Sequence, residues 1–179
     1  MLALQVNSRL PPALIFRLLA ALQGFAPAVA QSAPSAVNLA MVGEPPSLDP
    51  MQATTDLVGT IMQHVYEPLY TFDAKWNVVP MLAESMPRFS ADGKAVTITL
   101  RKGVKLHSGL TLDAEDVVVS LKRWIKEAPR GKALGKEIVE LKSVGDLTIE
   151  MTLKAPYAPL LAQLALPSGM AAIMAKESA

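Results

Sequence analysis

The segment that most constrains the fold is a run of helical periodicity that begins at Asp113 and stops before Pro129. Its apolar residues recur at the i, i+3, i+4, i+7 spacing that buries one face of a helix. Asp113 stands at the N-cap position, Glu115 and Asp116 add negative charge to the first turn, and Lys126 lies near the other end, where cations are favoured. We therefore predict an amphipathic scaffold helix without a catalytic role. The residues expected on its buried face are Ala114, Val117, Val118, Leu121, Trp124 and Ile125.

Two segments with strand periodicity flank this helix, and each contains a glycine at its reversal. Residues 88–101 form the first, with a turn at Gly93, and residues 138–153 form the second, with a turn at Gly145. Two antiparallel hairpins with helices between them indicate the α+β class. The apolar residues that alternate with polar ones are Val96, Ile98 and Leu100 in the first hairpin and Ile149, Met151 and Leu153 in the second.

The other predicted elements are shorter. We expect a strand at 37–42, a helix at 56–69, a small hairpin of 70–72 with 78–79, a helical turn at 80–85, a polar loop at 127–136, a helix at 158–166 and a last strand at 170–174. Methionines, including Met41, Met62, Met81, Met151, Met170 and Met174, fall at positions typical of a core, where they fill gaps.

The N-terminal residues differ in composition from the rest of the chain. Asp and Glu are absent before Glu44, and the apolar run Leu18–Ala30 ends in Ala-Val-Ala. A basic lead, a short apolar core and such an ending are typical of a secretory signal peptide, and the run is too short for a membrane span. We predict a signal peptide at 1–30 and a flexible lead-in at 31–36. A disordered or mis-assigned extension is the alternative.

Charge and side-chain chemistry exclude several functions. Residues 31–179 carry 15 Lys and Arg against 16 Asp and Glu, without a basic stripe, so nucleic-acid binding is not expected. Cysteine is absent, so neither a disulfide nor a thiolate metal site can form. His64 and His107 lie in different elements without a second ligand at metal spacing. No nucleophile with a matching base is recognisable, so we expect neither an enzyme nor a metal or other cofactor.

A family resemblance runs through several of these segments. In LRKGVKLHSGLTLDAEDVVVSLKRW, residues 100–124, the matching positions are Leu100, Arg101, Gly103, Val104, Gly109, Ala114, Glu115, Asp116 and Val117, while Leu106 replaces an aromatic residue. Residues 44–50, 65–85 and 148–165 agree in the same order. Together they resemble the extracellular solute-binding proteins that serve peptide and nickel ABC importers, over roughly residues 37–175.

The resemblance implies a two-lobed fold in which a solute lies in the cleft between the lobes. Residues 37–179 would be part of the N-terminal lobe and would bind solute through a strand exit and a turn. The implied binding residues are Met41, Gly43, Glu44, Ser47, Ser168 and Gly169. Glu44 would receive an amino group and Ser168 would offer a hydroxyl, although an ordinary turn residue is an equally good interpretation of each. Some nickel-importer relatives have an arginine near this turn, so Ser168 counts against chelated nickel.

The implied role is the substrate-binding component of an ABC importer for peptides or a related solute, working in the periplasm with a permease of the inner membrane. Without the acylated cysteine of lipoprotein relatives, the product would be soluble and unanchored. Because the relatives are several hundred residues longer, we expect a truncated fragment with weak or no binding alone, which titration calorimetry with di- and tripeptides would test. A small independent periplasmic interaction module, a nickel or metallophore-binding component and an unrecognised hydrolase remain as alternatives.

Overall fold

The structure, a computed structural model, describes residues 39–179. Contacts divide the chain into a unit of residues 1–40, of which the structure describes Leu39 and Ala40 as irregular and exposed, and a unit of residues 41–179. The helices of the second unit are α2 (Asp56–Met62), α3 (Ala114–Glu127), α4 (Pro129–Gly135) and α5 (Leu160–Ala165). Its strands are β1 (Tyr70–Phe72), β2 (Val78–Pro80), β3 (Arg88–Phe89), β4 (Ala95–Thr99), β5 (Ile138–Ser143) and β6 (Thr148–Leu153). The predicted signal peptide and lead-in lie outside the described residues.

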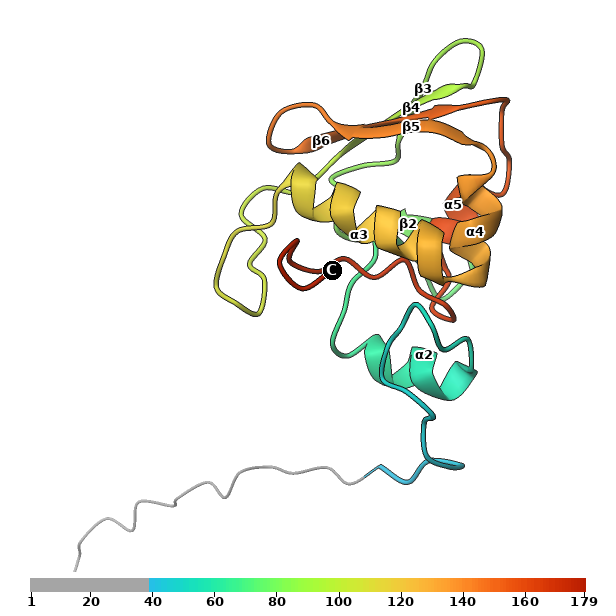
Figure 1. Ribbon diagram of the computed structural model, residues 1–179, viewed down its shortest axis with the longest axis vertical. Coiled ribbons are helices and arrows are strands. Elements are labelled where there is room, and N and C mark those ends of the chain that lie inside the picture. The colour runs from blue at the N-terminus through green and yellow to red at the C-terminus, as the bar shows by residue number, and fades with distance from the viewer. Residues whose placement is uncertain (1–38) are drawn as a thin grey trace, which may run out of the picture. The chain divides into compact units, whose positions relative to one another are not determined.

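A four-stranded antiparallel sheet with the order β3-β4-β6-β5 forms the top of the unit in Figure 1. Both predicted hairpins are confirmed, and Gly93 and Gly145 adopt φ values of 69° and 72° at their reversals. All five residues of the central strand β4 pair with the neighbouring central strand β6, with Val96 opposite Met151 and Ile98 opposite Ile149. The residues expected on the inner face are at most 2 % exposed, so the alternation of apolar and polar residues correctly predicts which face of the sheet is buried.

Helix α3 packs on one face of this sheet, against β5 and β6, and against α4 (Figure 1). Asp113 is its N-cap: its Oδ1 accepts a hydrogen bond from the Asp116 amide, and Asp116 Oδ2 accepts one from the Asp113 amide. This reciprocal capping box satisfies two donors at the start of the helix. The expected apolar face is buried except for Ile125, which is partly exposed.

The C-terminal segment runs along α3 on another face of the helix (Figure 1). Ser120 is fully buried, and its Oγ donates to the Met174 carbonyl and accepts from the Met174 amide. Asp116, one turn earlier, accepts from the Lys176 amide, and Ile173 pairs in an isolated bridge with Glu67. The predicted strand at 170–174 is therefore wrong: these residues form one isolated bridge, at Ile173, and the backbone of Met174 is bound by the side chain of Ser120.

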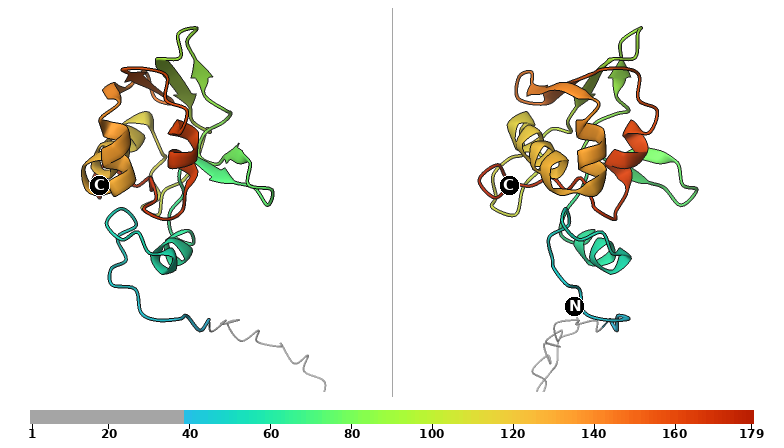
Figure 2. Two further views of the ribbon diagram at one scale, coloured as in Figure 1. Left: turned by 90° about the vertical axis from the view of Figure 1, so that its right-hand side faces the viewer. Right: turned by 45° about the vertical axis from the view of Figure 1, so that its right-hand side comes forward.

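The β1–β2 hairpin is confirmed and contacts α5, which lies within the predicted helix at 158–166 (Figure 2). Tyr70 and Leu69 join the core at its base. The predicted helical turn at 80–85 is wrong: the amides of Met81 and Ala83 both donate to the Leu69 carbonyl, and Ala83 bridges to Leu100. The segment bends instead of coiling into a helical turn, because its backbone pairs with Leu69 on one side and with Leu100 on the other.

Three more predictions need correction. Residues 39–42 of the predicted strand are irregular and exposed. The predicted helix at 56–69 ends at Met62, because the chain then turns and Glu67 pairs with Ile173. The predicted loop at 127–136 contains helix α4, which starts at Pro129 and buries Leu134. Gly131 indicated a loop, yet its missing side chain allows α4 to approach the carbonyl of Trp124, which a Cβ would overlap.

The methionine prediction holds for most of the expected positions. Met62, Met151, Met170 and Met174 belong to the buried core, and so does Met51. Met41, with 42 % of its surface exposed, and Met81, which is only partly buried, do not, so the expectation is wrong for both. Among residues 39–179, no helix is both long and apolar enough to cross a bilayer.

Candidate functional site

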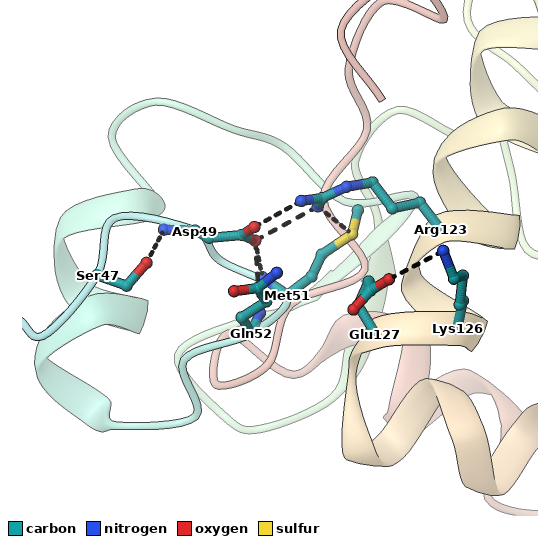
Figure 3. A network of polar contacts seen from close by, with 7 residues as sticks. All are labelled: Ser47, Asp49, Met51, Gln52, Arg123, Lys126 and Glu127. Atoms are coloured by element: carbon teal, nitrogen blue, oxygen red, sulfur yellow. Dashed lines mark hydrogen bonds and ion pairs between the residues drawn. The ribbon is translucent and has the colours of Figure 1, made fainter.

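The segment that leads into α2 is fixed by a charged network around Asp49 (Figure 3). Ser47 Oγ accepts a hydrogen bond from the Asp49 amide at 3.0 Å, and Asp49 Oδ1 accepts one from the Met51 amide at 2.9 Å. Arg123 of α3 reaches this turn from the other side. It donates to both carboxylate oxygens of Asp49, at 2.5 and 3.3 Å, and its Nη1 lies 2.9 Å from the sulfur of Met51. A bidentate pair of this kind fixes orientation as well as distance.

Both members of this pair are charged at neutral pH. Burial by itself raises the pKa of Asp49, but the hydrogen bonds from Arg123 and the Met51 amide hold that pKa below its ordinary value. The hydrogen bond to Asp49 raises the pKa of Arg123 in turn. The side chains retain 21 % and 25 % of their exposure, so solvent screens the pair less than it would a surface salt bridge.

The turn that follows α5 is held by the next residue of α3. The indole N–H of Trp124, fully buried, donates to the Gly169 carbonyl at 2.8 Å. Arg130 of α4 donates to the carbonyl of Ser168. Gly169 has a φ of 61°, which glycine adopts without strain. The turn at 167–169 is thus fixed by α3 and α4.

A direct hydrogen bond joins the two segments. Ser168 Oγ donates to the Thr54 carbonyl at 2.6 Å. Close packing adds to it, because a Cβ on Gly59 of α2 would lie 3.1 Å from the Pro167 carbonyl oxygen. Consecutive residues of α3, Arg123 and Trp124, therefore hold two segments far apart in sequence, and these segments also contact each other. We call residues 47–54 and 166–169 together the anchored wall.

The anchored wall includes only part of the sequence-predicted site. Ser168 and Gly169 lie in its turn, and Ser47 begins its first segment. Met41, Gly43 and Glu44 are exposed, and no hydrogen bond among the described residues joins them to Ser168 or Gly169. The binding role of all six stays a prediction. Sequence reasoning missed Asp49, Thr54, Arg123 and Arg130, and treated Trp124 only as part of an apolar face.

A separate hollow lies away from the anchored wall. A surface pocket of about 610 Å³ is lined mainly by residues 63–67 and 101–107. His107 Nε2 lies 2.9 Å from the Val65 carbonyl oxygen at its edge, and Arg101 lies 3.8 Å from Glu67. His64 and His107 both line this pocket, although the sequence places them in different elements. Residues 39–179 contain no group of three or more His, Asp or Glu side chains able to hold a metal ion.

Comparison with known proteins identifies the class of this fold. The model of bacterial extracellular solute-binding proteins, family 5 Middle, matches residues 77–179. Because this match covers more than half of the chain, the protein belongs to the family of bacterial extracellular solute-binding proteins, family 5. The resemblance stated from the sequence is confirmed, and so is the α+β class as part of a periplasmic binding protein fold.

Individual relatives include binders of different solutes. The glutathione-binding protein GsiB of Pectobacterium atrosepticum is 36% identical over 126 residues, which are 69% of this chain and 24% of the relative. The nickel-binding periplasmic protein of Escherichia coli is 38% identical over 105 residues, 58% of this chain and 20% of the relative. The periplasmic binding protein DppA of Helicobacter pylori, solved with the peptide STSA, is 26% identical with a TM-score of 0.63, over 73% of this chain and 29% of that one. The chain thus spans about a quarter of the length of these relatives.

Proposed function

We propose that this chain supplies one side of the solute site in the substrate-binding component of an ABC importer, and that the solute is a peptide or a close relative of one. The protein acts by binding and release, not by catalysis. It reaches the periplasm through the signal peptide at 1–30 and delivers its solute to a permease of the inner membrane. Family membership supports the solute-binding class, and the peptide-binding relatives support the choice of solute.

The observation that carries this proposal is the joint fixation of the anchored wall by α3. Binding sites gain affinity when their polar groups are held in place before the solute arrives, because less conformational freedom is lost on binding. Here Arg123 fixes residues 49–51 and Trp124 fixes Gly169. The Ser168 hydroxyl, which already donates to Thr54, keeps its lone pairs for an N–H donor of the solute. The exposed carboxylate of Glu44 suits the ammonium group of a peptide.

Chemical-shift mapping on the isotope-labelled full chain tests the proposal. Trialanine, glutathione and nickel ions are titrated separately into the millimolar range. Such concentrations detect complexes whose free energy of binding is as small as about 4 kcal/mol. We expect the peptides to shift amide signals within 41–54 and 166–169. Shifts with nickel but neither peptide would favour the nickel-binding alternative, and no shifts in these segments with any of the three would refute a solute site here.

A matched pair of variants connects the shifts to the wall. Ser168→Ala removes the hydroxyl of the turn, and Ser143→Ala removes an exposed hydroxyl at the end of β5, outside the wall. Removing one hydrogen-bonding group typically weakens binding by about 1 kcal/mol, or roughly fivefold. We expect this loss with Ser168→Ala only. Equal affinity in both variants would exclude Ser168 from the site.

A further inference from the structure

The turn between β1 and β2 presents an exposed tryptophan. Trp76 has 76 % of its surface exposed, and its φ of 62° is the single positive value among the non-glycine residues that the structure describes. Large aromatic side chains normally bury their surface, and a left-handed backbone costs free energy for any residue with a Cβ. The Phe72 ring packs beside the indole, with centroids 5.6 Å apart and planes at 52°. The exposed indole therefore lies against a ring that is itself partly buried on the core.

Asp73 fixes this turn. Its Oδ1 accepts hydrogen bonds from the amides of Lys75 and Asn77, both at 2.8 Å, and its Oδ2 accepts one from the Asn77 side chain at 3.1 Å. The Asn77 side-chain and backbone hydrogen bonds hold the pKa of Asp73 below its ordinary value, so the carboxylate is charged at neutral pH. Oδ2 accepts one hydrogen bond from the described residues and has capacity for another.

A small hollow of about 190 Å³ lies between this turn and the anchored wall. Its lining residues are Gln63, Thr71, Phe72, Asp73, Trp76, Ala165 and Pro167. Pro167 belongs to the wall, so a solute at Ser168 lies next to the hollow. The chemistry of the lining is distinctive: it includes two aromatic rings and a carboxylate, and none of its residues carries a positive charge. The larger pocket at 101–107, in contrast, is rich in lysine and arginine.

We propose that Phe72, Asp73 and Trp76 form a subsite that receives a cationic side chain, lysine or arginine, of a peptide bound at the anchored wall. The inference rests on the proposed function, since it needs a solute at the wall. An ammonium or guanidinium group is attracted by the face of an indole and by a carboxylate, whereas an acidic side chain is repelled by Asp73. The hollow has room for one such side chain and is open to solvent, which keeps the cation partly hydrated.

The test compares three tripeptides that differ at one side chain. Ala-Lys-Ala, Ala-norleucine-Ala and Ala-Glu-Ala are titrated into the labelled full chain, and the indole N–H signal of Trp76 and the amides of 166–169 are followed. We expect the lysine peptide to bind about three- to tenfold more tightly than the norleucine peptide and to shift the Trp76 signal. The glutamate peptide should bind most weakly.

Two variants preserve the fold of the turn. Trp76→Gly suits the positive φ and removes the ring, and Asp73→Asn removes the charge but keeps an oxygen for the turn hydrogen bonds. Each should abolish most of the preference for lysine while norleucine binding stays unchanged. Phe89→Ala is the control, because it removes another exposed aromatic ring, 49 % exposed, outside the hollow.

The failures of the two proposals are distinguishable. Equal binding of the three peptides at 166–169, or a lysine preference that survives in Trp76→Gly, would overturn the subsite and leave the proposed function standing. Absence of shifts at the anchored wall with every peptide would overturn the proposed function and the subsite together.

Discussion

Replacing Trp124 by phenylalanine is expected to detach the turn at 167–169 from α3 without unfolding the chain. The indole N–H that donates to Gly169 is lost, and this buried carbonyl is left without its partner. An unsatisfied buried group costs about 1–3 kcal/mol. The smaller ring also leaves a void, which adds about 1 kcal/mol. The free energy of unfolding should fall by about 2–4 kcal/mol, a substantial part of the 5–15 kcal/mol typical of a domain.

The assay combines urea unfolding with amide hydrogen exchange. The Met174 amide, which donates to Ser120, lies in the segment that follows the turn and reports its local opening. The Met151 amide in the central strand β6 reports opening of the core. In Trp124→Phe, exchange at Met174 should accelerate more than exchange at Met151, because the segment opens before the sheet does.

Leu121→Ala is the matched control. Leu121 is 1 % exposed on α3, and its truncation should cost a similar 2–5 kcal/mol without removing a hydrogen bond. We expect exchange at Met174 and Met151 to accelerate equally in this variant. If Trp124→Phe gives the same uniform pattern as Leu121→Ala, the indole serves only as core packing, and its role in holding the turn is refuted.

Two further predictions concern the N-cap of α3 and the ion pair between α3 and Asp49. Asp113→Ala removes the N-cap of α3 and should lower the free energy of unfolding by about 0.5–2 kcal/mol in urea titration. An unchanged value would mean that the Asp116 carboxylate, which accepts from the amides of residue 113 and Lys176, is enough to sustain the first turn. Asp49→Asn should cost about 1–2 kcal/mol at pH 6, because it removes the charge that Arg123 pairs with. Arg123 lowers the folded-state pKa of Asp49, so the stability that the ionised carboxylate contributes is complete above the unfolded pKa of about 4. This contribution disappears as the pH falls through the folded pKa. The free energies of unfolding of wild type and Asp49→Asn should therefore converge at low pH. A constant difference across that range would argue against the charged pair.

The sequence predicted the parts of the fold that depend on local pattern. Helix α3 and both hairpins follow from apolar spacing, a capping aspartate and glycines at the reversals, all of which act over a few residues. Helix α4 was missed because Gly131 was interpreted as a loop residue, although it permits close contact with Trp124. The path of residues 170–174 was missed because Ser120, a buried polar residue of α3, pairs with backbone 54 residues away.

The candidate site was predictable only as two separate segments. Resemblance indicated the strand exit and the turn, but the groups that hold them lie on α3 and α4. The Asp49–Arg123 pair spans 74 positions and the Trp124–Gly169 bond spans 45, and no short-range pattern reports such contacts. One local pattern could nevertheless have indicated these contacts. An arginine lies beside a tryptophan next to an apolar helix face, and both side chains carry N–H donors that apolar packing does not require. Such donors indicate hydrogen-bond partners outside the helix.

The most direct test of the central claim is whether one bound solute touches both segments that α3 holds. Nuclear Overhauser effects between trialanine and the labelled full chain test this directly, because they are observed only between atoms that lie close together. We predict cross-peaks from the same peptide to residues in both 47–54 and 166–169, and their joint weakening in Trp124→Phe. Cross-peaks confined to the pocket at 63–67 and 101–107 would contradict the claim and move the solute site there.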